Sequence, residues 1–165
     1  MPSLWRCAMS LRYPIGLSGE VVEFSDGVLT HFENHIQRRC WQCEAGGQLF
    51  ASLDRNIVHI AVASGPRDKD FRAPFLYVPN KAEERREIAH FYRLGLHYVG
   101  DWHTHPQDIA QPSALDLKTA KSTFLRSKHM LGGLLLVIVG RVKAPRGLFV
   151  SLTDYEGSHR LDAAW

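Results

Sequence analysis

Two histidines and an aspartate in the stretch GDWHTHPQDIAQPSALDL, residues 100–117, have the types and spacing of metal ligands. If His103 and His105 stand at the end of a strand, their side chains point to the same face about 6 to 7 Å apart, close enough to share one ion. Pro106 then ends the strand, and Asp116 returns in the first turn of the next helix. Two imidazole nitrogens and one carboxylate form a three-ligand zinc set with a fourth position for water, which is the pattern of a catalytic zinc site.

The same residues also have a purely structural interpretation. The segment SALD, residues 113–116, precedes an apolar helical run and matches a capping box, in which Ser113 and Asp116 satisfy free backbone N–H groups. His103 and His105 would then be ordinary surface histidines at the end of a strand. The spacing alone does not decide between a metal site and a helix cap.

Cysteines offer a second candidate metal site. Cys40 and Cys43 form a C-x-x-C pair, and His31 and His35, one helical turn apart, lie just upstream and could supply two more ligands. A single C-x-x-C match is often a coincidence, and the competing interpretation is two small thiols at a helix end. The chain has three cysteines, so they cannot all pair with one another, and we expect reduced thiols.

Length and composition predict one compact domain over residues 1–165. Apolar residues make up 45% of the 165 positions, which is enough for a substantial core. The formal net charge of +3 is small and evenly spread, so nucleic acid and anionic membranes are disfavoured as main partners. Residues 1–14 lack the hydrophobic run of a secretory signal, and the most apolar segment, 131–139, is about half the ~20 residues of a membrane-spanning helix. We therefore expect a cytoplasmic protein.

Strand and helix patterns alternate along the chain and predict an α/β or α+β layered domain, with helices flanking one mixed sheet. The first helix has Ser25 or Asp26 as its N-cap, and the second opens with a capping-box pattern from Asn80 to Glu83. Helices are expected at 26–37, 80–94 and 113–127, the last turning Leu117, Ala120 and Phe124 inward. Strands are expected at 46–53, 57–64, 96–105, 134–139 and 147–152, the first two joined as a hairpin.

Polarity and side-chain alternation make three further predictions. Residues 65–74, GPRDKDFRAP, are expected to form a polar, basic loop, and the chain from Tyr155 onward a loose tail. Asp101 shares the face of the two histidines, which would allow a hydrogen bond to a ligand imidazole, but we favour a solvated acid at a sheet edge. Trp102 points the opposite way and is expected in the core.

Two motifs together resemble those of a known family. The run from His103 through Ser113 to Asp116 resembles the JAMM signature H-x-H-x7-S-x-x-D of the MPN-plus (JAB/Mov34) metalloproteases, and every position matches. Upstream, EAGGQL at residues 44–49 resembles that family's E-x-G-G-x-L element, in which a glutamate precedes the first strand of the sheet. The motifs occur in the family's order, and together they favour a metal site over a helix cap alone.

The resemblance implies a curved sheet flanked by helices over a core of about residues 25–154, with one zinc ion per chain. Carried over onto the matching positions, His103, His105 and Asp116 would ligate zinc, Glu44 would act as general acid/base, and Ser113 would help to hold the oxyanion. Zinc would acidify a bound water and polarise an amide carbonyl, and the glutamate would move a proton from that water to the departing amine. The choice of Glu44 rests on the resemblance alone.

In that family the substrate is usually an amide that joins the C-terminus of ubiquitin or a ubiquitin-like protein to a lysine. The resemblance therefore implies a zinc-dependent isopeptidase whose substrate tail is extended and pairs with an exposed sheet edge. Arg67, Lys69 and Arg72 could guide an acidic partner, although a solvated loop is the commoner meaning of such a run. The alternatives are a peptidase that trims a sulfur-carrier protein in cofactor or cysteine biosynthesis, and a non-catalytic MPN scaffold.

The stretch RREIAHFYRLGLHYVGDWHTHP, residues 85–106, narrows the resemblance further. It is similar to compact bacterial JAB proteins that are encoded beside ubiquitin-like E1 and E2 enzymes in anti-phage operons of the CBASS and Bil types. This similarity implies that the partners are a ubiquitin-like protein or its conjugates and the E1- and E2-like enzymes of the same operon. The identity of the ubiquitin-like partner is not encoded in these residues.

Overall fold

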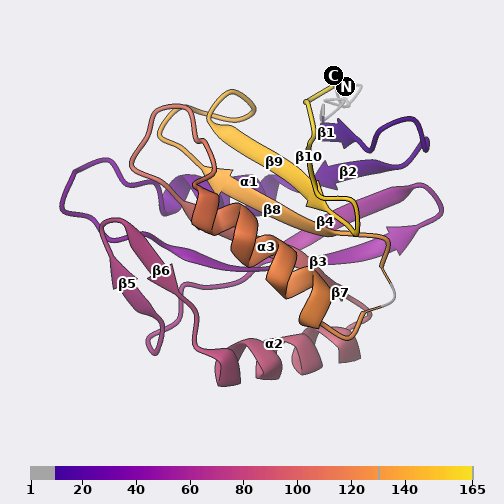
Figure 1. Cartoon of the computed structure of the whole chain (residues 1–165), viewed down its shortest axis with the longest axis horizontal. Coiled ribbons are helices and arrows are strands. Elements are labelled where there is room, and N and C mark those ends of the chain that lie inside the picture. Colours follow the sequence, from indigo (N-terminus) through magenta and orange to yellow (C-terminus); the bar gives the residue numbers. More distant parts are fainter. Residues whose placement is uncertain (1–9, 130, 165) are drawn as a thin grey trace, which may run out of the picture.

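One mixed sheet forms the centre of the molecule (Figure 1). The computed structural model describes residues 10–129 and 131–164. The sheet strands are β1 (Leu11–Pro14), β2 (Val21–Phe24), β3 (Gly46–Asp54), β4 (Ile57–Ala63), β7 (His97–Thr104), β8 (Leu134–Val139), β9 (Leu148–Thr153) and β10 (Ser158–Arg160). They lie in the order β1-β2-β4-β3-β7-β8-β9-β10, in which β2–β4 and β7–β8 are parallel and the other pairs antiparallel.

Three helices cover the two faces of this sheet, and a small hairpin stands apart from it (Figure 1). The helices are α1 (Asp26–Asn34), α2 (Lys81–Arg93) and α3 (Ala114–Arg126), and the hairpin consists of β5 (Phe71–Ala73) and β6 (Leu76–Val78). Helix α1 lies behind the sheet, whereas α3 crosses in front of it and α2 lies along its lower side. The predicted fold class, a mixed sheet flanked by helices, is confirmed.

Strand β8 shows why the middle of the sheet is well buried. Its six residues are all buried, as expected for a continuous apolar run with a layer on either face. Leu135, Val137 and Val139 join the main core with Val28 and Phe32 of α1. Leu136 and Ile138 point to the other face, where Ala120 of α3 packs against them. Because the side chains of β8 alternate between the two faces of the sheet, the strand packs against α1 on one face and α3 on the other.

The predicted helices and hairpin are confirmed, with differences at their ends. The first helix stops at Asn34, three residues early, where the His35 backbone N–H donates to the Phe32 carbonyl and the chain continues into irregular turns. Helix α2 begins after Asn80 as predicted, but its capping box is only half formed. The Asn80 side chain accepts two backbone N–H groups, whereas the Glu83 carboxylate pairs with Lys69 and Arg86.

Residues 65–74 are not the solvated loop that was expected. The Arg67 side chain is only 8% exposed, and it bonds Glu87 of α2 and approaches Asp70 within 3.5 Å. The end of the segment forms β5, which pairs with β6. Arg67 and Asp70 therefore fasten this segment to Glu87 of α2 and Tyr77 of β6, whereas Asp68, Lys69 and Arg72 remain exposed as expected.

The chain after Tyr155 is also not a loose tail, and the sheet extends beyond the predicted core of residues 25–154. Strand β10 pairs with β9, and the Leu161 N–H donates to the Val150 carbonyl. The Ala164 N–H then donates to Arg12 of β1, so the C-terminal segment crosses from one edge strand of the sheet to the other. None of the helices in the described residues is long and apolar enough to cross a membrane.

Candidate metal centre

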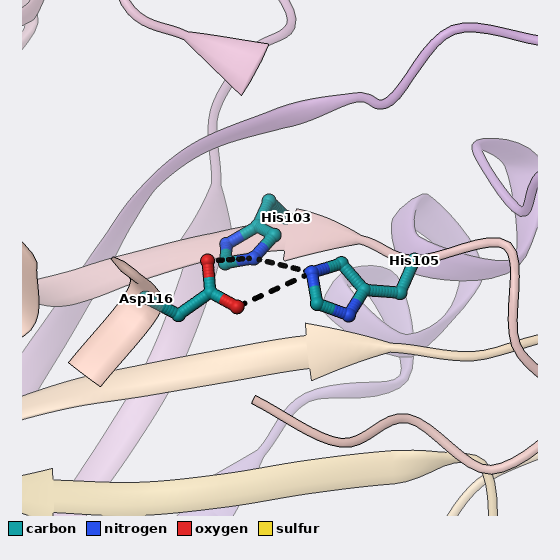
Figure 2. A group of neighbouring side chains, drawn as sticks. All are labelled: His103, His105 and Asp116. Atoms are coloured by element: carbon teal, nitrogen blue, oxygen red, sulfur yellow. Dashed lines mark hydrogen bonds and ion pairs between the residues drawn. The ribbon is translucent and has the colours of Figure 1, made fainter. Parts of the chain in front are cut away.

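The three predicted metal ligands converge at one point (Figure 2). His103 comes from the end of β7, His105 follows that strand directly, and Asp116 lies in the first turn of α3. The His103 Nε2 and His105 Nε2 atoms are 3.2 Å apart. The Asp116 carboxylate reaches between the rings, with Oδ1 3.1 Å from His103 Nε2 and Oδ2 3.3 Å from His105 Nε2.

These separations fit a tetrahedral zinc ion. Bonds of about 2.0 to 2.1 Å at tetrahedral angles place ligand atoms about 3.3 Å from one another. The two Nε2 atoms, 3.2 Å apart, have this spacing, and each lies within 3.3 Å of one of the two Asp116 oxygens. The donor set, two imidazole nitrogens and a carboxylate oxygen, is one that zinc accepts, and all three residues line the cleft. The local fold that produces it is a strand with a period of two followed by a helix with its acid in the first turn.

The second candidate metal site is not formed. Among the described residues, His103, His105 and Asp116 are the group of three or more potential ligands whose atoms lie close enough to hold one ion. His31 Nε2 instead hydrogen-bonds the Gly65 carbonyl, and His35 Nδ1 the carbonyl of His31, while both rings pack near Trp102. The two described cysteines, Cys40 and Cys43, are free thiols.

Electrostatics around the ligands favour a positive charge between them. Burial by itself raises the pKa of Asp116, but hydrogen bonds from His103 and His105 hold the pKa of that carboxyl well below its usual range. Burial lowers the pKa of His105, and the neighbouring Asp116 and Glu44 more than compensate, so that the pKa of His105 is raised. The carboxylate therefore stays ionised near neutral pH and attracts a proton or a metal cation to the imidazoles.

The helix cap and the cluster of His103, His105 and Asp116 are both present, so the two interpretations of SALD do not exclude each other. The Ser113 hydroxyl accepts from the Asp116 N–H, and Asp116 Oδ2 accepts from the Ser113 N–H at 2.7 Å and from its hydroxyl at 2.8 Å. Oδ2 is thus held by the cap, while Oδ1 points to His103. Ser113 lines the cleft, and in this arrangement its hydroxyl hydrogen orients Asp116.

Glu44 lies in the same cleft because of the register between β3 and β7. Gly46 pairs with His103, and the Thr104 N–H donates to the Ala45 carbonyl, so Glu44 comes opposite His105. Its side chain is buried, and burial raises the pKa of Glu44 to about 7, with a further increase from Asp116 and a decrease from His105. A carboxyl that titrates near neutral pH suits a group that accepts and returns a proton.

Two contacts from the β5–β6 hairpin hold the backbone of Glu44. The Glu44 N–H donates to the Ala73 carbonyl at 2.9 Å, and the Arg72 Nε donates to the Glu44 carbonyl at 2.7 Å. Arg72 is therefore occupied with the chain beside the site, although it was expected in a solvated run. The hairpin that positions Glu44 was not predicted from the sequence, and neither were β1, β2 and β10.

A buried polar cluster behind the site was not predicted. Gln37, 1% exposed, donates from Nε2 to the carbonyls of Gln42 and Pro74, both at 2.9 Å. Its Oε1 accepts from the Thr104 hydroxyl, whose oxygen in turn accepts the Ala45 N–H. Gln37 thus joins the loop before Glu44 and the turn of the β5–β6 hairpin to Thr104, which lies between His103 and His105. The only sequence signal is a polar residue at the end of an apolar helical pattern.

The two glycines of EAGGQL are required by close packing. An added Cβ at Gly47 would lie 1.9 Å from the Ser64 carbonyl oxygen, and one at Gly46 would lie 2.5 Å from the ring of Tyr77. Any side chain would force β3 away from β4 or from the hairpin. The glycines therefore let Glu44 approach the metal ligands on a tightly packed strand.

A cleft of about 620 Å³ extends from the metal ligands along β7. Its walls are α3 on one side and the β5–β6 hairpin with the start of α2 on the other, and its floor includes β7 and β8. Apolar side chains dominate the walls, and several of them remain exposed: Phe75, Leu76, Val78 and Leu115.

Asp101 is a partly buried acid on an interior strand rather than the solvated edge residue that we favoured. β7 is an interior strand between β3 and β8, and Asp101 Oδ1 is enclosed without a hydrogen-bond partner in the described structure. Its Oδ2 accepts the Tyr98 hydroxyl at 3.0 Å and not a ligand imidazole. Burial, with a contribution from Glu84, raises the pKa of Asp101 to about 7. Trp102 lies in the core, 1% exposed, as predicted.

A curled mixed sheet with a His-x-His pair at the end of a central strand and an aspartate at the start of the next helix defines the class of JAB domains. The family model described as "Prokaryotic homologs of the JAB domain" matches residues 30–153, and this chain belongs to that family. The fold is also similar to the solution structure of protein DSY2949 from Desulfitobacterium hafniense, with a TM-score of 0.60 at 18% identity over 83% of this chain and 87% of that one.

Curated relatives share one description. A "CD-NTase/cGAS isopeptidase" of Pseudomonas aeruginosa is 31% identical over 140 residues, which cover 83% of this chain and 85% of that protein. A protein of the same description from Escherichia coli is 26% identical over 69% of this chain and 72% of that protein. Another, from Enterobacter hormaechei, is 27% identical over 85% of this chain and 84% of that protein.

Proposed function

We propose that this protein is a zinc-dependent isopeptidase that cleaves after the C-terminus of a ubiquitin-like protein or ubiquitin-like tail, releasing it from conjugates or processing its precursor. The observation that carries the proposal is the convergence of His103, His105 and Asp116 with the buried Glu44 in one cleft. The description of the relatives as isopeptidases supports the same reaction class. We place this activity in the cytoplasm, in an anti-phage pathway of the CBASS or Bil type with E1- and E2-like partners.

The chain's own residues have distinct roles in this reaction. His103, His105 and Asp116 would hold one zinc ion, which when bound supplies a Lewis acid and a water of lowered pKa. Glu44 would take a proton from the attacking water and pass it to the departing amine. Ser113 orients Asp116 through the cap and donates to the developing oxyanion once its hydroxyl turns to the cleft.

The metal ligands are tested by elemental analysis of purified protein. We expect about one zinc per chain, lost in the His103→Ala/His105→Ala double variant because two of three ligands are gone. The matched control is Cys40→Ala/Cys43→Ala, which should keep its zinc because those thiols do not converge on a metal. Zinc that follows the cysteines instead of the histidines would contradict the assignment.

The mechanism is tested by digesting ubiquitin-like fusion proteins and reading the cleavage position by mass spectrometry. Glu44→Ala should keep zinc and fold and lose about 100-fold or more in turnover. Asp116→Ala should lose zinc and stability together, because it removes a ligand and half of the capping box. Ser113→Ala should keep most of its zinc and lose turnover. A wild-type protein that binds zinc but cleaves no fusion would favour the scaffold alternative, and cleavage of a sulfur-carrier precursor alone would favour the biosynthetic one.

A further inference from the structure

A second cavity, of about 220 Å³, lies at the end of the sheet opposite the metal ligands. Strand β3 begins opposite His103 and ends at this cavity, and the turns after β1 and β3 project from the same end (Figure 1). Apart from Glu20 and Arg55, the lining consists of apolar residues and glycines. Two of the apolar residues, Leu53 and Ile57, are 44% and 37% exposed. A cavity that opens between exposed apolar side chains favours the entry of another apolar group.

Leu17 stands on the turn between β1 and β2, beside this cavity. It is fully exposed, and the residues at the two ends of its turn, Ile15 and Glu20, both line the cavity. The Ile15 N–H donates to the Glu20 carbonyl at 2.8 Å, and the N–H and the hydroxyl of Ser18 donate to the Ile15 carbonyl. Both glycines of the turn have positive φ, 52° and 81°. A leucine on such a fixed turn loses little conformational entropy when it binds an apolar partner.

Glu20 and Arg55 give the same surface one acid and one base. Both residues are exposed, and neither takes part in the ion pairs of the described residues. Arg55 occupies the short turn between β3 and β4 with a φ of 40°, in the left-handed region that favours glycine or asparagine. An arginine at this position costs backbone strain, which indicates that its side chain is used outside the turn.

The surface formed by Leu17, Glu20, Arg55 and the cavity, which we call the turn patch, is complementary to itself. It presents an apolar projection and an apolar hollow, together with an acid and a base. In a dimer with a two-fold axis, the same surface of each copy faces the other, so each feature can meet its complement. The opposite signs of Glu20 and Arg55 make both symmetric contacts attractive at once. The chain itself therefore supplies every group that the turn patch needs.

We infer that two copies of this chain associate through the turn patch, with Leu17 of each copy in the cavity of the other and Glu20 of each facing Arg55 of the other. Both metal clefts stay open in this dimer, because they lie at the opposite ends of the two sheets. The turn patch is small, and small interfaces give weak association, so we expect a Kd on the order of 10 µM. The inference does not depend on the proposed isopeptidase activity.

Sedimentation equilibrium of the full chain, from about 1 to about 300 µM, measures this association. We expect the average mass to rise from near that of the monomer to near that of the dimer. Leu17→Ser should weaken the dimer about tenfold or more, because it removes the central apolar contact. It should keep the Tm of the monomer, because this side chain is fully exposed there. The matched control is Leu125→Ser on α3, which changes an exposed leucine that does not line the cavity and should keep the wild-type Kd.

Charge reversal tests the pairing of Glu20 with Arg55. Glu20→Lys and Arg55→Glu each place like charges opposite one another at both symmetric contacts, so each should weaken its own dimer about tenfold or more. A mixture of the two variants restores opposite charges at both contacts, and the mixed dimer should form with a Kd near that of the wild type. Arg55→Asn removes the charge and also relaxes the turn, so its Tm should hold or rise while its dimer weakens.

Four results would contradict this dimer. A chain that stays monomeric at about 300 µM has no such contact in solution. If Leu17→Ser lowers the Tm of the monomer, the leucine packs within its own chain. A dimer with the same Kd in Leu17→Ser is held by another surface. A mixture of Glu20→Lys and Arg55→Glu that stays monomeric would show that the two charges do not meet across the contact.

Discussion

Replacing Gln37 by leucine removes the polar link behind the metal centre while nearly preserving volume. The wild-type side chain makes three hydrogen bonds in a buried setting, to the carbonyls of Gln42 and Pro74 and with the Thr104 hydroxyl. Leucine cannot form these hydrogen bonds, so the two carbonyls and the Thr104 hydroxyl would each lose a partner. Each lost buried bond costs about 1 kcal/mol and more where the partner finds no water, so the free energy of unfolding should fall by about 3 to 5 kcal/mol.

The assay for this change is denaturant or thermal unfolding, combined with zinc content and turnover. A loss of about 3 kcal/mol corresponds to a fall in Tm of at least about 6 °C for a chain of this size. Zinc content should stay near one per chain because the ligands come from β7 and α3, while kcat should fall about tenfold or more, since the loop that ends at Glu44 is no longer held. Gln111→Leu, at an exposed position, serves as the matched control and should change stability by less than about 0.5 kcal/mol.

A double-mutant cycle with Thr104→Val sharpens the test. The Thr104 hydroxyl joins Gln37 to the Ala45 N–H, so the two substitutions should be non-additive by about 1 kcal/mol or more. A Gln37→Leu protein with wild-type stability, or one that loses stability but keeps full kcat, would refute the idea that this cluster positions Glu44.

Three other perturbations follow from single features of the structure. Gly47→Ala should lower stability by more than about 3 kcal/mol or prevent folding, measured by expression and Tm, because the new Cβ would meet the Ser64 carbonyl. In chelated protein, Glu44→Gln should gain stability over wild type by about 1 to 3 kcal/mol at pH 8 and nothing at pH 4. The reason is that burial raises the pKa of Glu44 to about 7, so the folded protein keeps a proton that the unfolded chain has already released. The stability of the wild type therefore falls as pH rises from the ordinary pKa of a glutamate to about 7, whereas that of Glu44→Gln does not. Urea midpoints of the two proteins that change in parallel over this pH range would contradict the prediction. Arg67→Lys should cost about 2 to 4 kcal/mol in urea unfolding, since an ammonium cannot reproduce both bonds to Glu87, and a neutral result would show that the buried pair is dispensable.

Features governed by local rules could be predicted from the sequence. The period of two brings His103 and His105 to one face of a strand, and the capping pattern places Asp116 in the first turn of α3. The hairpin of β3 and β4 and the apolar run of β8 follow in the same way from turn and strand patterns. Each of these depends on residues within a few positions of one another.

Features that depend on pairing between distant segments were decided by the tertiary structure. The register between β3 and β7 brings Glu44 beside His105. The residue pattern of either strand alone does not determine this register. The same applies to Asp101, which is partly buried because α2 packs against β7, and to Arg67, whose charge is paired with Glu87 of α2. The sequence around a polar residue does not show which distant residue will be its hydrogen-bond or ion-pair partner. A polar side chain needs such a partner only when it is buried, and it becomes buried only when the sheet and its helices have assembled.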